Sequence, residues 1–277
     1  MKKGVLLGAA VFLAAVSLGY AAQQEVPTGE LHGSIGVAYT SKYIWRGFDI
    51  FGDKSATHPF IDLDLFGTGL GFNITGHMAN SDGYQNSERW DYMMYYVGSL
   101  YQYEPYQTDY RLGYVYYNYP DSSAHTTNSI DLQEAQVVFS WPNISPLKGL
   151  VPSYVFVKLW PSNSGTIVGA RSPSGGTASG FAHIFMLDYA LPVMCPFTNM
   201  ERTLNIHSEL VYNDGVGPNG ANVDHDWSDA VVGISTNFDV AEDLVFTPGF
   251  FYQVTMDKSV DRDKDEAWVS LCMTYKF

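Results

Sequence analysis

The feature that most constrains this chain is an alternation of apolar and polar residues with a period of two, repeated along most of its 277 residues. From residue 31 to residue 45 the odd positions are mostly apolar or aromatic, whereas most even positions are small or polar. Successive side chains of a β-strand point to opposite faces, so this pattern predicts a strand with one apolar and one wet face. Twelve such segments lie near residues 31–46, 61–65, 70–78, 89–100, 108–118, 130–141, 151–159, 181–191, 204–212, 229–238, 244–254 and 266–277.

The connections between these segments alternate between long and short. If the chain starts on the periplasmic side, the outer loops fall near residues 46–56, 79–88, 119–129, 161–180, 213–227 and 256–265. The inner turns then fall near residues 67–69, 102–107, 142–150, 192–202 and 239–243, and most of them are shorter. Long outer loops, short inner turns and an even number of strands are typical of outer-membrane barrels. The sequence therefore predicts an all-β fold, a transmembrane antiparallel up-and-down β-barrel of about twelve strands.

The N-terminus predicts export. Two lysines are followed by an apolar run over residues 4–16 and by small residues up to Ala22, the pattern of a secretory signal peptide. The apolar run is too short for a membrane anchor. We therefore expect a signal peptide at 1–22, a short periplasmic segment at 23–30 and the barrel domain at 31–277. Without the two lysines the formal charge falls from −14 to −16, which argues against a nucleic-acid partner.

Aromatic residues and the C-terminus favour a barrel over a soluble β-sandwich, which would alternate in the same way with shorter strands. Charged residues make up only 16% of the chain, against roughly 25% in a soluble domain. Aromatic side chains near predicted strand ends suit the membrane–water interface: Tyr43, Trp45, Tyr110, Trp141, Trp160, Tyr189, Tyr212 and Tyr275. The last strand ends at Phe277 with apolar residues at alternate positions, the pattern read by the outer-membrane assembly machinery. We therefore predict a Gram-negative outer-membrane location, with surrounding lipid, lipopolysaccharide and that machinery as partners.

Three stretches carry a family resemblance. They are residues 39–47, which contain Ser-Lys-Tyr-Ile-Trp-Arg-Gly, residues 109–120, which contain Gly-Tyr-Val-Tyr-Tyr-Asn-Tyr-Pro, and residues 134–137. Together they resemble the proteobacterial "Gcw" family of conserved hypothetical exported proteins over roughly residues 31–140. This chain departs from that family in its longer outer loops and in Trp45. The resemblance implies an outer-membrane barrel and transfers no catalytic residue, because the family has no established activity.

The polar face of the predicted strands carries charges of both signs, which need water or each other. These residues are Lys42, Arg46, Asp62, Asp64, Asp109, Arg111, Glu134, Lys158 and Glu209. Our candidates for a lumen or eyelet that selects small solutes are Lys42, Arg46, Asp62, Asp64, Arg111 and Glu134. This predicts a narrow porin-like channel or passive transporter. A structural or surface-binding barrel with a plugged lumen, in which the same charges pair with each other, remains the alternative.

A lipid-modifying enzyme is a second alternative. It would need a nucleophile, a base and an orienting group at the outer rim. His77, His125 and His183 lie near predicted strand ends or loops, but the chain has neither a Gly-x-Ser-x-Gly nor a His-Glu-x-x-His motif. We therefore predict no enzymatic activity.

Acidic outer loops and two cysteines complete the set of candidate groups. The loop from Asp257 to Glu266, and the carboxylates Asp224, Asp226 and Asp229, could offer oxygen ligands to Ca²⁺, although the EF-hand spacing is absent. Such runs are more often solvated loop tips, so we predict no cofactor and no metal site. Cys195 and Cys272 are expected to be free thiols.

Overall fold

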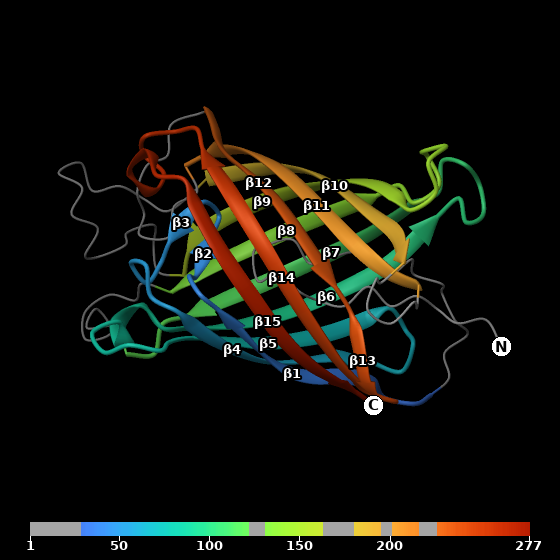
Figure 1. Ribbon diagram of the computed structural model, residues 1–277, viewed down its shortest axis with the longest axis horizontal. Coiled ribbons are helices and arrows are strands. Elements are labelled where there is room, and N and C mark those ends of the chain that lie inside the picture. The colour runs from blue at the N-terminus through green and yellow to red at the C-terminus, as the bar shows by residue number, and fades with distance from the viewer. Residues whose placement is uncertain (1–28, 122–130, 163–179, 195–200, 216–225) are drawn as a thin grey trace.

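The protein folds into a closed antiparallel β-barrel (Figure 1). The structure is a computed structural model that describes residues 29–121, 131–162, 180–194, 201–215 and 226–277. Twelve long strands form the wall: β1 His32–Thr40, β4 Ala56–Asp64, β5 Leu70–Ala79, β6 Arg89–Leu100, β7 Thr108–Asn118, β8 Leu132–Ser140, β9 Leu150–Pro161, β10 Gly180–Met194, β11 Glu201–Asp214, β12 Asp226–Thr236, β14 Leu244–Thr255 and β15 Glu266–Lys276. The short strand β13, Phe238–Ala241, pairs with the start of β14. The prediction of an up-and-down barrel of about twelve strands is confirmed.

The barrel closes where β15 pairs with β1. Gly33 and Phe277 exchange backbone hydrogen bonds of 2.9 and 3.0 Å at this seam, next to the C-terminus. A closed sheet leaves no unpaired strand edge, which hydrocarbon would not tolerate. The described part of the chain has no helix of the length and apolarity needed to cross a membrane.

The two faces of the wall differ as the alternation predicted. On β15, Val269, Leu271 and Tyr275 are exposed on the outside, whereas Trp268 and Cys272, at positions of the opposite parity, are buried toward the lumen. The same division holds on β7, where Leu112 and Tyr114 point outward. Apolar side chains therefore face the lipid, and most charged side chains of the strands face inward.

Strand β9 corrects one prediction. We expected Val155, Val157 and Leu159 to face lipid and Lys158 to face water, but the three apolar residues are buried inside and Lys158 faces outward. The Nζ atom of Lys158 lies 4.0 Å from the ring centroid of Phe181 on β10. Both faces of β9 are largely apolar, so alternation alone does not define its orientation. Pairing defines it, because Leu159 is opposite Glu134 and cross-strand partners share a face.

The first predicted strand is also shorter than expected. It leaves the wall after Thr40, and residues 41–55, here called the plug segment, fold into the barrel. The plug segment contains a small separate hairpin of β2, Ile44–Trp45, and β3, Phe48–Asp49. Figure 1 shows this hairpin within the ring of strands, at the end away from the C-terminus. Tyr43 and Trp45 are therefore buried in the lumen and do not lie at the membrane interface.

Several predictions fall on residues outside the described ranges. They include the signal peptide at 1–22, nearly all of the segment 23–30, parts of the outer loops, His125, Cys195 and Asp224. Cys272 is a buried free thiol on the inner face of β15.

Candidate functional site

The plug segment turns back on itself at Arg46 and Gly47. Both residues have positive φ, +50° and +88°, as a tight two-residue hairpin turn requires. A Cβ atom on Gly47 would lie 2.6 Å from Cγ1 of Val260 and 2.8 Å from Oδ1 of Asp229. The side-chain amide of Gln253 on β14 donates a 2.8 Å hydrogen bond to the Gly47 carbonyl. Only glycine fits at this tip, which packs against β12, β14 and the last outer loop.

A buried ion pair joins the turn to the opposite wall. Nη2 of Arg46 lies 2.5 Å from Oε2 of Glu134 on β8, and both side chains are almost completely buried. The hydroxyl of Tyr117 on β7 donates a 2.8 Å hydrogen bond to the same carboxylate oxygen. A buried charge requires a partner of this kind, because transferring it alone out of water costs several kcal/mol, about 3–5 when one partner of a pair is removed. Of the six eyelet candidates, these two form a direct pair.

Arg89, at the start of β6, holds the plug segment through aromatic rings. Its guanidinium lies 4.6 Å from the ring centroids of Trp45 and Tyr117, and 5.9 Å from those of Tyr43 and Tyr119. Two of the four rings belong to the plug segment, Tyr117 lies on β7 and Tyr119 follows that strand directly. Arg89 also donates a 2.7 Å hydrogen bond to the Tyr43 hydroxyl. Desolvated cation–π contacts are among the stronger of their kind, so this residue connects the plug segment to the wall.

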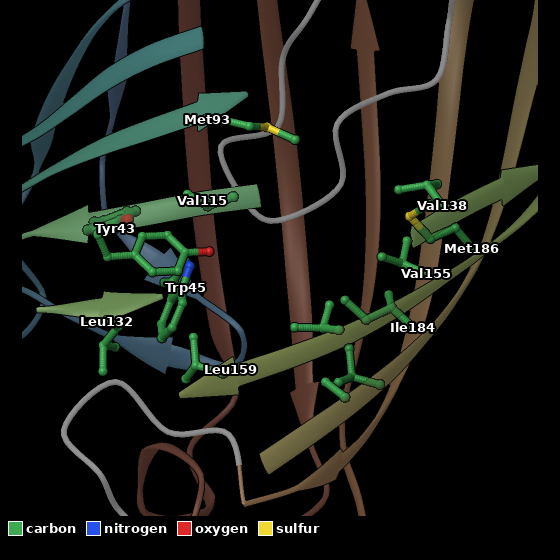
Figure 2. Close-up of a cluster of buried hydrophobic side chains, with 14 of the residues drawn as sticks. Tyr43, Trp45, Met93, Val115, Leu132, Val138, Val155, Leu159, Ile184 and Met186 are labelled. Atoms are coloured by element: carbon green, nitrogen blue, oxygen red, sulfur yellow. The ribbon is translucent and has the colours of Figure 1, made fainter. Parts of the chain in front are cut away.

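The rings of the plug segment rest on an apolar part of the lumen wall. Figure 2 shows Tyr43 and Trp45 near Leu132 and Leu159, which come from β8 and β9. These residues belong to one buried cluster that continues along β9 and β10. The plug segment is therefore held by packing as well as by charge.

A chain of hydrogen bonds runs beneath Tyr43. Oγ1 of Thr40 is 2.9 Å from Nε2 of His58, Nδ1 of His58 is 2.9 Å from Nδ1 of His77, and Nε2 of His77 is 3.0 Å from Asp91. The Tyr43 ring stacks on His77 at 4.7 Å and 11°. The whole chain is covered by the plug segment, so a substrate has no access to Thr40 or to either imidazole in this arrangement.

Charges at the outer rim form a second group around Asp53. Nζ of Lys42 lies 2.5 Å from Oδ1 of Asp53, and Nζ of Lys264 lies 2.8 Å from the same atom. Both ammonium groups also pair with the buried carboxylate of Glu266. Hydrogen bonds from Lys264 and Lys42 lower the pKa of Asp53 to about 2. We call Lys42, Asp49, Asp53, Asp261, Lys264 and Glu266 the rim cluster.

The carboxylates of the rim cluster lie close enough together to hold a cation. Ligand atoms of Asp49, Asp53 and Glu266 lie within 4.8 Å of one another. Lys42 and Lys264 pair with Asp53 and Glu266, so two positive charges already offset part of the negative charge of these three carboxylates. Partial burial and the neighbouring Glu266 raise the pKa of Asp261 to about 6. The rim cluster thus connects the plug segment to the last outer loop by ion pairs that respond to pH.

The remaining eyelet candidates lie lower in the barrel. Asp62 on β4 accepts hydrogen bonds of 3.0 Å from the Asn73 amide and 2.7 Å from the Tyr95 hydroxyl. Arg111 on β7 is buried, with its guanidinium 5.8 Å from the Tyr95 ring centroid. Asp64 is exposed and accepts a 3.0 Å hydrogen bond from the Gly67 backbone N–H in a periplasmic turn. The six candidates therefore occupy four separate places and do not form one ring.

Sequence reasoning did not identify Arg89, His58 or the inward position of Tyr43 and Trp45. Strand β6 carries Tyr and Met at both odd and even positions, so its alternation did not show that Arg89 points into the barrel. One signal was present, since Gly47 interrupts a strand-like pattern between Trp45 and Phe48, and an isolated glycine in such a pattern indicates a bulge, a bend or a close backbone approach. His183 lies outside the barrel, where its Nδ1 is 2.7 Å from the Tyr154 hydroxyl.

Comparison with known proteins identifies the fold. No protein-family model and no curated protein matches the chain, so the resemblance to the Gcw family stays a prediction. Among solved structures, a NanC porin is 12% identical with a TM-score of 0.52, covering 88% of this chain and 100% of its own. A KdgM porin solved with disordered oligogalacturonate is 10% identical, with a TM-score of 0.47 and coverage of 88% and 99%. The chain is thus a transmembrane β-barrel with the fold of bacterial outer-membrane porins.

Proposed function

We propose that this protein is a narrow porin-like channel for the passive transport of small solutes, constricted at its outer end by the plug segment. The observation that carries the proposal is that the β2–β3 hairpin lies inside the wall without joining its sheet. Between residues 43 and 51 the described backbone hydrogen bonds join the hairpin to itself, as from Ile50 N–H to the Tyr43 carbonyl. The hairpin narrows the lumen and is separate from the twelve strands that close the barrel.

The contacts that hold the plug segment are made by side chains. They are the Arg46–Glu134 pair, the rings around Arg89, the Gln253 hydrogen bond and the rim cluster. Such contacts can exchange while the backbone hydrogen bonds of the wall stay intact, because the hairpin is not part of the sheet that closes the barrel. A constriction of this kind can change its width without unfolding the barrel.

A sealed structural barrel is the second candidate. The dense burial of Tyr43, Trp45 and Phe51 favours it, because a packed lumen leaves little room for solute. An enzymatic role has less support, since His77 is covered and His183 faces lipid. In either non-enzymatic case, we propose that outer-membrane lipid and lipopolysaccharide surround the barrel and that the assembly machinery reads the strand ending at Phe277.

The test is conductance of the purified, refolded protein in planar bilayers, together with swelling of liposomes in arabinose and in sucrose. A channel gives discrete current steps and admits the smaller sugar faster. Absence of steps and of swelling in the wild type would contradict the proposal. Steps that appear only after the plug segment has been loosened would favour the sealed barrel.

A further inference from the structure

Arg111 is a buried cation whose hydrogen-bonding capacity is not used by the described residues. It lies on the inner face of β7, where its side chain is 4% exposed. Its Nε and Nη2 atoms have no hydrogen-bond acceptor among the residues that the structure describes. A buried donor left without an acceptor destabilises the folded protein, because its hydrogen bonds to water are lost and not replaced. Within the described part of the chain, the Nε–Nη2 edge of this guanidinium therefore has no acceptor.

The nearby carboxylates are engaged elsewhere. Asp62 accepts hydrogen bonds from Asn73 and Tyr95, and Glu134 accepts them from Arg46 and Tyr117. Asp109, two residues before Arg111, accepts from Ser99 at 2.6 Å and from Gln107 at 2.9 Å. The charges of Asp62 and Glu134 act on Arg111 through space, without a hydrogen bond.

The surroundings of Arg111 along the sheet are apolar. Its cross-strand partners are Val97 on β6 and Val138 on β8, and neither side chain accepts a hydrogen bond. Val138 is in turn opposite Val155 on β9. Apolar flanks lower the local dielectric, so an ionic hydrogen bond at this position is stronger than one in water.

The positions of Nε and Nη2 indicate which chemical group could accept hydrogen bonds from them. Nε and Nη2 carry parallel N–H bonds on one edge of the planar guanidinium, and this edge matches the two oxygens of a carboxylate. Arg46 and Arg89 also have buried nitrogen atoms without a hydrogen-bond partner among the described residues, but each of these arginines forms an ion pair, Arg46 through Nη2 with Glu134 and Arg89 through Nε with Asp91. We propose that Arg111 binds the carboxylate group of small organic acids inside the lumen. This inference deepens the proposed channel function and rests on it.

The negative charge of Asp62 weakens the binding of an anion at this site. Its carboxylate and the guanidinium of Arg111 flank the same ring, that of Tyr95. A solute carboxylate at Arg111 is repelled by Asp62, so binding is weaker than with the arginine alone. Weak binding suits a channel, because a solute that binds tightly does not leave. Asp62→Asn keeps the acceptor for Tyr95 and removes the repulsion.

The experiment measures binding of D-gluconate to the full-length folded protein in detergent micelles by calorimetry, and block of channel current by gluconate in bilayers. D-glucose is the neutral probe of equal size, and inorganic phosphate is the second anion. We expect gluconate to bind and glucose not to bind. Arg111→Lys keeps the charge but loses the two-bond edge, and it should weaken gluconate binding about tenfold. Asp62→Asn should strengthen binding about threefold through loss of repulsion.

Arg202→Gln is the matched control, because Arg202 lies over the Phe238 ring at the periplasmic end of β11, away from the lumen. It should leave gluconate binding within about twofold, since Arg202 lies on the outer face of β11 and charges separated by more than about 10 Å are largely screened. Wild-type binding of phosphate as strong as that of gluconate, or an Arg111→Lys variant that binds like the wild type, would overturn the carboxylate site. The protein could also bind gluconate in micelles, lose this binding in Arg111→Lys, and show no conductance in bilayers. That result would support the carboxylate site and contradict the channel function. Intact heat-modifiable migration in electrophoresis confirms that each variant is folded.

Discussion

Arg46 and Glu134 face each other inside the barrel with 2.5 Å between Nη2 and Oε2, one on the plug segment and the other on the wall. Both are shielded from water, so neither charge has an alternative partner in solvent. This pair sets the position of the hairpin turn relative to β8. It also makes the position of the hairpin sensitive to a single substitution.

Glu134→Gln should destabilise the seated plug segment by about 3–5 kcal/mol, because it leaves the Arg46 guanidinium buried and unpaired. We expect larger current fluctuations in bilayers and faster proteolysis of the plug segment. The double variant Arg46→Met with Glu134→Gln should recover part of the loss, since no buried charge then lacks a partner. A double variant as loose as the single one would contradict the role of the pair.

Gly47→Ala should displace the hairpin turn. Its new Cβ would lie 2.6 Å from Val260, and overpacking of this kind costs about 1–3 kcal/mol. Gly83→Ala is the matched control, because Gly83 also has positive φ, +94°, but has open space around its Cβ position. Hydrogen exchange of the plug segment should rise in the first variant and much less in the second. Equal exchange of the plug segment in the two variants would contradict the close packing of the hairpin turn against Val260.

The rim cluster should be most stable between about pH 4 and 6. Asp261 has a pKa near 6 against an ordinary 3.8, so the folded state holds its proton more tightly and stability rises as the pH falls through 6. Asp53 has a pKa near 2, so its contribution to the stability of the rim cluster is fully present above pH 3.8 and is lost as the pH falls toward 2. Openings of the channel should therefore be rarer at pH 5 than at pH 8.

Asp261→Asn isolates this effect. The variant cannot titrate at position 261, so its opening frequency should be the same at pH 5 and pH 8. Single-channel recordings with the pH changed only on the outer side provide the measurement. A variant that keeps the full pH dependence would assign the effect to another group.

The direction of β9 can be tested with single cysteines in a background without the native ones. Phe156→Cys should place its thiol in the lipid and Val155→Cys should place it in the lumen, as their burial indicates. A lipid-soluble nitroxide should therefore quench the fluorescence of a label attached at position 156 and leave that of a label at position 155 unchanged. The reverse result would restore the orientation that alternation alone had predicted.

The sequence predicted the wall far better than it predicted the lumen. Strands such as β5, β11 and β15 have one apolar face. Lipid contacts one face of the wall and water the other, so the alternation in the sequence has the same period of two as the pleat of the strand. Strand β9 is apolar on both faces, so its direction depends on pairing with β8, which no local pattern encodes. The plug segment was missed because Tyr43 and Trp45 continue the alternation of β1 after the chain has left the wall.

The candidate site depends on contacts between residues far apart in the chain. Arg46 and Glu134 are 88 residues apart, and Arg89 and Tyr43 are 46 apart. Alternation places a charge on the inner face, but it does not give the height or the angle around the barrel at which that charge lies. The grouping of inward charges into a pair, a rim cluster and an unpaired guanidinium therefore required the three-dimensional fold.

The role of the plug segment is tested most directly by the single-channel conductance of a variant in which residues 43–51 are replaced by a Gly/Ser linker of equal length. If the plug segment constricts a lumen that is otherwise open, conductance should rise about threefold or more, because a twelve-stranded wall is wider than one filled by its own side chains. Electrophoretic mobility should show that the barrel is still closed. Unchanged conductance in a correctly folded variant would contradict the claim that the plug segment sets the width of the pore.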